Sequence, residues 1–461
     1  MSILIVGGGI TGLATAFRLR QRHPEQSITL LERSDRVGGN IRTDVQDGFR
    51  IEAGPNGFLD NKPSTLQLCH DLGLGEQLVA ASEGSRKNRY VYLKGRLQKL
   101  PGSLMSFIGS PLLTLGGKIR FALEPRQPRR ESDEDESIAA FATRRAGRQA
   151  ADVFADALVT GIHGGDPELL SVRACFPRLV GFEAAHGSVI RGVSRAATQR
   201  RLDATARGEP APGPTRMWSF PGGLQVMVDA LSASLGDVIQ KSVSLQRIER
   251  TPTGWRAIGE NNGSWNADTL ILTMPAYEQA RLLADVDPTL ANQLNAIEYN
   301  RIAVVAVGFR AEDVPGGPMD GFGYIAPQRT RRDVLGVQWC SSIFPGRAPD
   351  GHLLWRALCG GWHRREMLDW TDAEIVRAVV AELRLVHQLR GEPVMTKVIR
   401  WPRAIPQYFL GHLARIAAIE ARVESEHPGL ILSGNAFHGV AMNDCVEQGS
   451  VLAERAAMTT L

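Results

Sequence analysis

The sequence has little of what builds a disulfide framework or a metal centre. Its 461 residues include five cysteines, an odd number, and no two of them form a CxxC pair. Reduced thiols in a cytoplasmic compartment are the simpler interpretation, and no metal site is expected. The excess of basic residues is also small, with a formal net charge of +4. Because no aromatic-interleaved basic motif accompanies it, nucleic acid is not an expected partner.

Long apolar runs are missing too, and none reaches the length that spans a bilayer. The nearest candidate, residues 100–123, is broken by Pro101, Pro111 and a glycine pair. We interpret it as a buried helix pair, with an element that dips into a membrane as the alternative. Ser2 to Val6 leads directly into glycines and lacks a basic stretch and a cleavage site. It is therefore expected to be a strand and not a signal peptide.

The chain is longer than one hydrophobic core usually supports, so two or three lobes are expected. With 43% hydrophobic and 22% charged residues, its composition is that of a soluble globular protein. The order strand, helix, strand over residues 3–31 is typical of a parallel sheet. Further strands are predicted at 243–248, 269–273, 302–309 and 353–358, helices at 64–78, 138–158 and 373–389, a solvated loop at 124–136, and a lobe boundary in the loop 205–214.

Three glycines between the first strand and the first helix fit the pattern GxGxxG, at Gly7, Gly9 and Gly12. Gly7 permits a tight turn, Gly9 lets the backbone approach a pyrophosphate, and Gly12 lets the helix pack closely on the strand. Glu32 follows twenty residues later, at the end of the second strand. A carboxylate there suits two ribose hydroxyls and repels the additional phosphate of NADP. The pattern therefore predicts a dinucleotide-binding site.

The residues that follow favour FAD over NAD. Arg36 and a doublet, Gly38-Gly39, come soon after Glu32, where an NAD enzyme would continue into another strand–helix–strand unit. At the other end of the chain, residues 432–449 predict a strand, a glycine turn and a helix that begins near Val440. The N-terminus of such a helix would stabilise the negative charge of a reduced flavin. Both ends of the chain are thus expected to form one cofactor site.

These segments resemble the FAD-binding amine oxidase superfamily, whose members carry E-x-x-x-R-x-G-G after the second strand. Within it, the sequence is similar to the FAD-dependent protoporphyrinogen oxidases, which include a coproporphyrinogen-oxidising bacterial branch. The more specific similarities are WPRAIPQY at 401–408 and GNAFHGVAMNDC at 434–445. Residues 88–92, 161–171 and 321–327 also fit, so the resemblance covers essentially the whole chain.

The resemblance implies an α/β fold, in which a Rossmann-type FAD-binding domain carries an inserted α+β substrate domain and an inserted mainly helical domain. The FAD-binding domain is expected to be discontinuous, at 1–60, 215–260 and 400–461. The mainly helical domain, which is the candidate for facing a membrane, is expected at 85–205. The substrate-binding domain is expected at 61–84 and 261–399.

Site residues follow from the same resemblance. The cofactor-binding residues are expected to be Gly7, Gly8, Gly9, Ile10, Thr11, Gly12, Glu32, Arg33, Gly39, Asn40, Gly54, Pro55, Asn56, Gly57, Val243, Trp401, Gly434, Val440, Ala441 and Met442. Arg89 stands at the family's carboxylate-holding arginine, and a guanidinium fork suits the propionates of a tetrapyrrole. The macrocycle pocket is expected to be lined by Gly161, Phe322, Ile325 and Leu358.

Three positions depart from the family's pattern. Leu358 stands where the family often has an aromatic residue, so stacking on the macrocycle is expected to be looser. His163 stands where the family more often has tyrosine or phenylalanine, so a general base and a histidine of the pocket wall or core are the alternatives. The second of these is favoured. Gln338 stands where an apolar pocket residue is expected, and this puts the local polarity of the pocket in doubt.

The reaction implied by the family removes six electrons and six protons from a porphyrinogen, with O₂ as oxidant and H₂O₂ as product, in heme biosynthesis. The flavin performs the redox chemistry, so no catalytic side chain is assigned. The sequence does not decide between protoporphyrinogen IX and coproporphyrinogen III. An amine oxidase, a carotenoid desaturase or a flavoprotein without oxidase turnover are the alternatives. The first two are not expected to share residues 405–408 or the Asn443–Cys445 ending.

Partners are expected to be the porphyrinogen and O₂. Two further partners stay open: a membrane met by peripheral contact, and the next enzyme of the heme pathway, to which the product would be handed. The cytoplasm is the expected location, with the cytoplasmic face of the membrane as the alternative.

Overall fold

Three separate stretches of the chain build one unit of the structure, and two build the other. Unit 1 comprises Met1–Ala80, Met217–Glu298 and Leu413–Leu461, and unit 2 comprises Ala81–Arg216 and Tyr299–His412. The computed structural model describes residues 2–208 and 213–458. The loop expected as a lobe boundary precedes the change of unit after Arg216, although residues 209–212 of that loop lie outside the described part.

The strand predicted at residues 3–6 is the central strand of a parallel sheet in unit 1. This strand, β1 (Ser2–Val6), pairs with β2 (Ser27–Leu31) on one side and β14 (Thr269–Leu272) on the other. The full order is β10-β2-β1-β14-β20, with β10 at Ile239–Gln240 and β20 at Leu430–Leu432. All neighbouring pairs are parallel, and burial on both faces explains the apolar runs of β1 and β14.

Smaller sheets and, among the described residues, seven α-helices complete unit 1. The additional strands are β3 (Thr43–Gln46), β4 (Phe49–Glu52), β5 (Phe58–Leu59), β6 (Val79–Ala80), β9 (Met217–Ser219), β11 (Leu245–Thr251), β12 (Gly254–Gly259) and β13 (Ser264–Ala267). The helices are α1 (Ile10–Arg22), α2 (Pro63–Asp71), α12 (Gln225–Leu235), α13 (Ala276–Leu283), α14 (Pro288–Asn295), α17 (His412–Glu426), which starts at the last residue of unit 2, and α18 (Met442–Met458).

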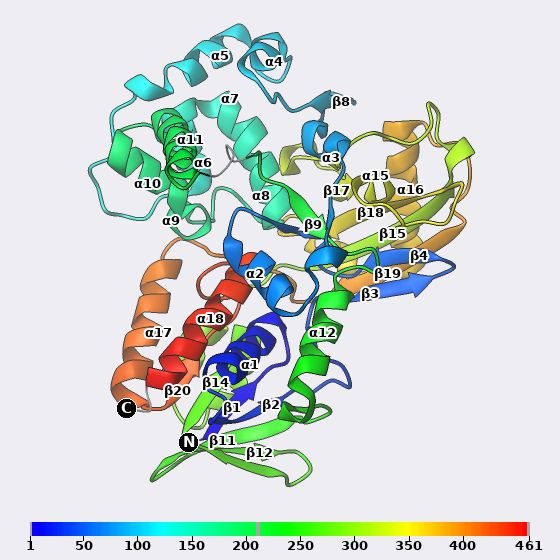
Figure 1. Cartoon of the computed structure of the whole chain (residues 1–461). Coiled ribbons are helices and arrows are strands. Elements are labelled where there is room, and N and C mark those ends of the chain that lie inside the picture. Colours follow the sequence, from blue (N-terminus) through cyan, green and yellow to red (C-terminus); the bar gives the residue numbers. More distant parts are fainter. Residues whose placement is uncertain (1, 209–212, 459–461) are drawn as a thin grey trace. The chain divides into compact units, whose positions relative to one another are not determined.

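The first and last helices of the chain pack side by side. Figure 1 shows α1 in blue beside α18 in red. The contact is close because Gly449 faces Ala14: a Cβ at Gly449 would stand 2.6 Å from the Cβ of Ala14. Both ends of the chain therefore belong to one core, around the parallel sheet of unit 1.

Unit 2 is built on a seven-stranded mixed sheet of order β19-β15-β18-β17-β16-β7-β8. Its strands are β7 (Arg89–Leu93), β8 (Arg96–Lys99), β15 (Ile302–Arg310), β16 (Gly323–Ile325), β17 (Val334–Gln338), β18 (His352–Gly360) and β19 (Met395–Trp401). Helix α16 (Asp372–His387) places Ile375, Val379 and Leu383 in the core against one face of this sheet. The opposite face carries every expected substrate residue that lies on a strand.

The other helices of unit 2 come mainly from its first segment. They are α3 (Glu83–Lys87), α4 (Leu104–Gly109), α5 (Leu115–Ala122), α6 (Ile138–Ala146), α7 (Arg148–Ala150), α8 (Asp156–Ile162), α9 (Val172–Cys175), α10 (Pro177–His186), α11 (Val189–Ala206) and α15 (Cys340–Ile343). A π-helical turn at Ala151–Ala155 joins α7 to α8. Within the described residues, no helix is both long enough and apolar enough to cross a membrane.

The helix pair expected at 100–123 is present, as α4 and α5, but its predicted burial is wrong. Leu104, Met105 and Leu115 are 74%, 77% and 75% exposed. Only the inner faces pack, through the rings of Phe107 and Phe121, whose centroids lie 4.9 Å apart. Helical spacing of apolar residues showed that a helix was present, but it did not show that its outer face has no covering element.

The solvated loop expected at 124–136 is also wrong at its first residue. Glu124 is only 2% exposed and forms an ion pair with the buried Arg145 of α6. Its carboxylate accepts hydrogen bonds from Ser188 Oγ and from the N–H of Val189 at the start of α11. The partners of Glu124 lie in other helices, so the local charge pattern gave no sign of them.

Candidate active site

The turn between β1 and α1 has the geometry that the glycine pattern predicts. Gly7 has φ +109°, and a Cβ at Gly12 would lie 2.1 Å from the carbonyl oxygen of Gly7. Gly9 caps α1 without any side-chain hydrogen bond, and a Cβ built on it would meet no atom within 4 Å. The N–H groups of the first turn of α1 therefore border open space, as a pyrophosphate requires.

Glu32 lies beside this turn at the end of β2. Its Oε2 accepts a hydrogen bond from the N–H of Gly8 at 2.7 Å, and its Oε1 accepts one from the N–H of Ser34 at 2.9 Å. The N–H of Val243 donates to the carbonyl of Glu32 at 2.9 Å, so this distant predicted residue joins the group. Arg33 turns toward Glu278 instead, at 2.8 Å, and its side chain is 62% exposed.

A second glycine loop lies close to the first. The N–H of Gly38 donates to the carbonyl of Gly8 at 2.7 Å, and the guanidinium of Arg36 donates to the carbonyl oxygens of Gly39 and Val37. Arg36 thus shapes the loop from within, a role that its place in the sequence motif did not specify. Gly54 meets this loop, since a Cβ there would stand 2.1 Å from the carbonyl oxygen of Asn40.

The turn at Gly54–Gly57 holds a buried amide that fits a cofactor. Asn56 is 5% exposed, and neither its amide nitrogen nor its amide oxygen has a hydrogen-bond partner among the contacts of the described residues. A buried amide without partners destabilises a fold by an estimated 1–3 kcal/mol per group. A flavin offers both donors and acceptors, so the residues present fit the FAD that the sequence predicts.

The start of α18 is fixed by two neighbouring side chains of the helix. Asn443 Nδ2 donates to the carbonyl of Leu59 at 2.6 Å, and its Oδ1 accepts from Thr65 Oγ1 at 2.7 Å. Asp444 accepts from the N–H of Ala441 at 3.1 Å and pairs with Lys62 Nζ at 2.7 Å.

Gly434, Val440 and Ala441 lie between β20 and α18, which begins at Met442. Every predicted cofactor residue except Trp401 therefore belongs to unit 1. Trp401 ends β19 in unit 2, where it pairs with Ile302. Whether each of these residues contacts FAD stays a prediction.

The expected substrate residues come together on one face of the sheet of unit 2. Arg89 of β7 pairs with Gly323 of β16. In a second row across the sheet, Val91 of β7 pairs with Ile325 of β16. This row continues through Gly336 of β17 to Leu358 of β18. Residues paired across neighbouring strands point to the same face. Arg89 therefore shares a face with an apolar row that contains Ile325 and Leu358.

The other two expected substrate residues flank this face. The guanidinium of Arg89 lies over the ring of Phe322, 4.9 Å from its centroid. Gly161 of α8 approaches Ile325, where an added Cβ would stand 2.7 Å from Cδ1. All five residues predicted from the sequence thus lie near one another, although no two of them are close in the chain except Phe322 and Ile325.

Gln338 adds a polar group to the same face, together with a residue that the sequence reasoning missed. Arg356 is 3% exposed, and its Nη2 donates to Gln338 Oε1 at 2.8 Å. The signal was present in β18: Leu354, Arg356 and Leu358 alternate with residues of the opposite core, so Arg356 has to share the face of Leu358.

His163 is a residue of the protein interior. It is 2% exposed, and its ring packs edge-on against Phe176 with centroids 5.9 Å apart. Burial lowers the pKa of His163 to about 4. The imidazole is therefore neutral at pH 7, as expected for a histidine of the pocket wall or core.

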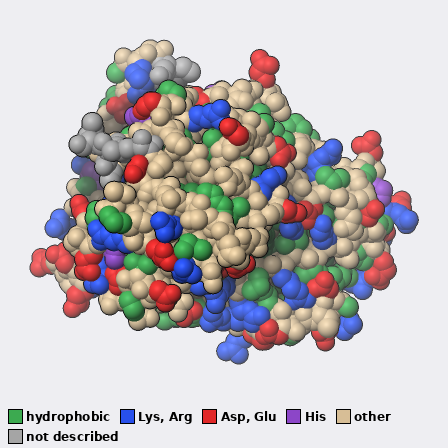
Figure 2. All heavy atoms as spheres, turned by 90° about the horizontal axis from the view of Figure 1, so that it is seen from below, with side chains coloured by type: hydrophobic (Ala, Val, Ile, Leu, Met, Phe, Trp, Pro, Cys, Tyr) green, Lys and Arg blue, Asp and Glu red, His purple; other side chains and the backbone are tan. Residues whose placement is uncertain are grey.

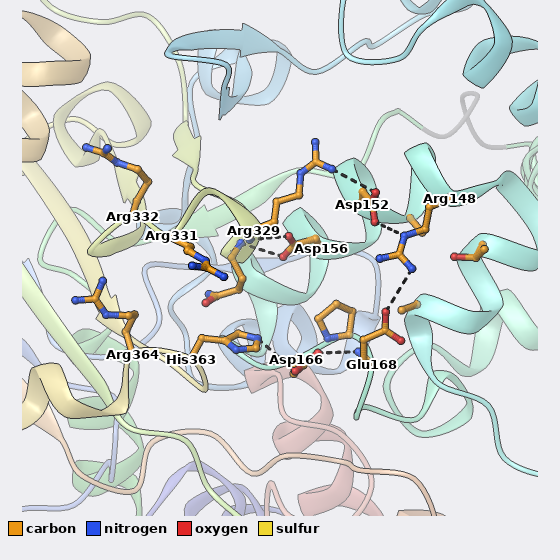
Figure 3. A pocket seen from close by; sticks show the side chains of 15 residues that line it. Arg148, Asp152, Asp156, Asp166, Glu168, Arg329, Arg331, Arg332, His363 and Arg364 are labelled. Atoms are coloured by element: carbon orange, nitrogen blue, oxygen red, sulfur yellow. Dashed lines mark hydrogen bonds and ion pairs between the residues drawn. The ribbon is translucent and has the colours of Figure 1, made fainter.

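A separate pocket of about 520 Å³ lies among the helices and loops of unit 2 (Figure 3). Its charges largely pair with one another: Asp152 bridges Arg148 at 2.8 Å and Arg329 at 3.4 Å, and His363 lies 3.3 Å from Asp166. None of the five expected substrate residues is among the described residues that line it. The pocket is therefore distinct from the candidate substrate face.

Comparison with known proteins gives the family. The model of the flavin-containing amine oxidoreductases matches residues 10–457. The chain belongs to this family. FAD is its cofactor, and both the resemblance and the α/β fold class that the sequence predicted are confirmed.

The relatives within this family extend over nearly the whole chain. Coproporphyrinogen III oxidase of Bacillus subtilis (strain 168) is 31% identical, over 97% of this chain and 96% of its own. Chloroplastic protoporphyrinogen oxidase 1 of Arabidopsis thaliana is 32% identical, over 96% of this chain and 86% of its own. The crystal structure of a protein from Exiguobacterium sp. 255-15, named as a protoporphyrinogen oxidase, superposes on this structure with a TM-score of 0.83. The two sequences are 26% identical, and the superposition covers 99% of this chain and 98% of the other.

Proposed function

We propose that this chain oxidises a porphyrinogen to the porphyrin in heme biosynthesis, with O₂ as oxidant and H₂O₂ as product. The observation that carries the proposal is the similarity to coproporphyrinogen III and protoporphyrinogen oxidases, which extends over more than nine tenths of the chain. The grouping of Arg89 with an apolar row supports it, because a porphyrinogen combines carboxylates with a large apolar macrocycle.

Each group of residues has a defined part in this proposal. When bound, FAD would supply the redox chemistry, as acceptor of electrons from the substrate and as their donor to O₂. Glu32 and the glycine turns hold and orient its ADP half. Arg89 binds a propionate as a charge-assisted pair, and Ile325 and Leu358 contact the macrocycle. No side chain is assigned as the acid or base, and the low pKa of His163 is consistent with that.

Parallel assays with the two porphyrinogens test the proposal. The purified holoenzyme is mixed in air with coproporphyrinogen III or protoporphyrinogen IX, and porphyrin fluorescence and H₂O₂ are followed. Enzyme-dependent formation of porphyrin together with peroxide is expected for at least one of them. If neither substrate reacts faster than its spontaneous oxidation, the proposed function is wrong.

Arg89→Ala is expected to raise KM for the porphyrinogen at least tenfold, with a smaller change in kcat and none in flavin content. One charge-assisted pair contributes about 1.5–3 kcal/mol, and its loss weakens ground-state and transition-state binding alike. Arg331→Ala is the matched control, because Arg331 is an exposed arginine of the same unit that lines the separate pocket. Steady-state kinetics of both variants check this. Equal KM values for Arg89→Ala and the parent enzyme would remove the assigned role.

Location and partners complete the proposal. We place the enzyme in the cytoplasm, in peripheral contact with the cytoplasmic face of the membrane, where it hands its porphyrin to the next enzyme of the heme pathway. The exposed apolar faces of α4 and α5 support the membrane contact. Recovery of the whole activity in the supernatant of a low-salt lysate, without binding to liposomes, would contradict it.

A further inference from the structure

A row of polar residues crosses the sheet of unit 2 next to the apolar row of the substrate face. Arg89 of β7 pairs with Gly323 of β16, which pairs on its other side with Gln338 of β17. Gln338 pairs in turn with Arg356 of β18. Residues paired in register point to one face, and neighbouring strands lie about 4.8 Å apart, so Gln338 stands about 10 Å from Arg89 along this row.

The face is open to a ligand at Gln338. Arg89 is exposed, and Ile325, Gln338 and Leu358 are half-buried. Gly323 contributes no side chain between Arg89 and Gln338. The polar row and the apolar row are displaced by two residues along each strand. A flat molecule that lies on Ile325 and Leu358 therefore has Arg89 and Gln338 along one of its edges.

Arg356 determines which end of the Gln338 amide is presented to that molecule. Its Nη2 donates to Gln338 Oε1 at 2.8 Å. A guanidinium has donors only, so the reverse orientation of the amide would set its NH2 group against another donor. The NH2 group of Gln338 is therefore turned away from Arg356, where it can donate to an acceptor on the substrate.

Arg356 also places a positive charge next to this amide. On the face drawn in Figure 2, lysine and arginine side chains lie at the surface among aspartate and glutamate side chains. Arg356 is different, because only 3% of it is exposed. A charge in the low-dielectric interior is less screened than one at the surface. A carboxylate that accepts from Gln338 is thus favoured over a neutral acceptor.

We propose that Gln338 binds a second propionate of the porphyrinogen through its amide NH2 group, and that Arg356 is the positioning residue that orients this amide. The inference rests on the proposed function and deepens it, because it adds a carboxylate-binding position to that of Arg89. Gln338 stands where the family's pattern has an apolar residue, so the pattern itself does not predict this contact. Arg89 and Gln338 hold two carboxylates along one edge, while Ile325 and Leu358 contact the macrocycle.

Gln338→Glu is the decisive variant. Glutamate keeps the size of the side chain and can form an ion pair with Arg356, but it offers no donor and adds a negative charge. KM for the porphyrinogen is expected to rise on the order of tenfold, with a smaller change in kcat. A purely structural role of Gln338 predicts no such rise, because the ion pair would hold β17 to β18 at least as well. An unchanged KM in Gln338→Glu would overturn the proposal.

Binding of the porphyrin product measures the same contact without turnover. The Kd of coproporphyrin III, followed by quenching of its fluorescence, is expected to rise on the order of tenfold in Gln338→Glu. Gln149→Glu is the matched control on α7. The Oε1 atom of Gln149 also accepts hydrogen bonds, from the N–H of Thr114 at 3.1 Å and from its Oγ1 at 2.9 Å, but Gln149 is on no strand of the sheet. This variant is expected to keep the KM and the Kd of the parent.

Arg356→Lys and Arg356→Met test the positioning role. Lysine keeps a charged donor for Gln338 Oε1, so KM is expected to stay close to that of the parent. Methionine leaves the amide free to turn, so KM is expected to rise. A lysine variant with a KM as high as that of the methionine variant would overturn the positioning role. Flavin absorbance and circular dichroism show whether each variant is folded. If Arg356→Met is misfolded, the comparison is made between Arg356→Lys and Gln338→Glu.

The two porphyrinogens distinguish which propionate is bound. Protoporphyrinogen IX has vinyl groups in place of two propionates of coproporphyrinogen III. A higher KM for both substrates in Gln338→Glu assigns Gln338 to a propionate that they share. A higher KM for coproporphyrinogen alone assigns it to one that only this substrate carries. Porphyrin binding that depends on Gln338, in a protein that turns over neither porphyrinogen, would contradict the proposed function and leave the carboxylate position standing.

Discussion

Glu32 uses both carboxylate oxygens on backbone N–H groups, which ties the glycine turn to the end of β2. Because each oxygen has two lone-pair directions, the carboxylate can also accept from ribose hydroxyls. Its removal therefore has two effects on the ADP half of the site: the turn loses a support and the ribose loses an acceptor.

Glu32→Ala is expected to lower FAD occupancy after purification by tenfold or more, with Glu32→Gln intermediate, because an amide oxygen keeps part of the acceptor function. The ratio of flavin absorbance to protein absorbance, and the dissociation constant of added FAD, measure the effect. Glu249→Ala serves as a control, since Glu249 is a carboxylate of β11 that pairs with Arg247. A fully yellow Glu32→Ala protein would refute the assignment.

Individual residues also show what a sequence reveals and what it hides. The glycines and Glu32 were predictable because each is required by a local turn or by a short spacing. Arg356 was missed, although the alternation along β18 already places it on the face of Leu358; its pairing with Gln338 depends on the partner strand. Asn56 was predicted from its motif alone, and its burial without hydrogen-bond partners emerges only once the surrounding loops are folded.

At the scale of elements, one buried charge pair joins η2 to α6, and hydrogen bonds to the same carboxylate join η2 to α11. Here η2 is the 3-10 turn Glu124–Arg126, and Glu124 and Arg145 have side chains that are only 3% and 2% exposed. Hydrogen bonds from Ser188 and from the backbone of α11 help to keep the pKa of Glu124 low, against the opposing effect of burial. Removing one member leaves the other buried without its partner.

Arg145→Met is therefore expected to reduce the free energy of unfolding by about 3–5 kcal/mol. Urea denaturation followed by circular dichroism measures the loss. Arg148→Met, a change at the exposed arginine three residues later, is the control and is expected to change stability by less than about 1 kcal/mol. A similar small effect for Arg145→Met would show that the buried pair is not needed for stability.

The start of α18 raises a different issue, that of charge near the flavin. Lys62 pairs with Asp444 at 2.7 Å and with Glu447 at 2.6 Å. Burial opposes its charged form, but the hydrogen bonds that it donates to these two carboxylates raise the pKa of Lys62 overall. The lysine therefore stays charged and offsets two negative charges in the first turns of a helix whose N-terminus is expected to face the flavin.

Lys62→Met is expected to make the midpoint potential of the bound FAD more negative by on the order of tens of millivolts, since 30 mV corresponds to about 1.4 kcal/mol for two electrons. The two uncompensated carboxylates disfavour the negative charge of the reduced flavin. Spectroelectrochemical titration measures the potential. Lys241→Met, at an exposed lysine of unit 1, is the control. An unchanged potential would place the flavin away from the start of α18.

Elements themselves were largely predictable where their pattern is local. The predicted strand at 302–309 is found at Ile302–Arg310, and the predicted helix at 373–389 is found at Asp372–His387. Their exposure was less predictable, as α4 and α5 show, because a face is buried or exposed according to what the rest of the chain packs against it. The pairing of strands separated by more than two hundred residues, such as β7 with β16, follows from no local signal.

For the whole molecule, two buried histidines link stability to pH. Burial lowers the pKa of both His163 and His387 to about 4, compared with about 6.5 in an unfolded chain. Between pH 6.5 and pH 4 the unfolded chain therefore binds more protons than the folded protein. The stabilisation from these neutral histidines is complete above pH 6.5 and is lost as the pH falls toward 4.

The free energy of unfolding is accordingly expected to fall between pH 7 and pH 5, by roughly 2 kcal/mol for each histidine. The double variant His163→Phe, His387→Phe lacks both titrating groups. Its free energy of unfolding is therefore expected to decrease less between pH 7 and pH 5, by up to the sum of the two histidine contributions. Urea titrations at the two pH values provide the comparison, and the variant at pH 7 serves as its own reference for any change in packing. Parallel pH dependence of the two proteins would rule out this linkage.

The discontinuity of unit 1 has a consequence for how the protein is made. β1 and α1 leave the ribosome before the other elements of unit 1, β14 is translated much later, and β20 and α18 follow all of unit 2. Domains tend to fold as units during synthesis, so most of unit 2 is complete while the nascent sheet of unit 1 still awaits its final strand. Stable capture of FAD is thus expected to be post-translational, and a ribosome stalled before residue 430 should carry a chain that does not retain the flavin.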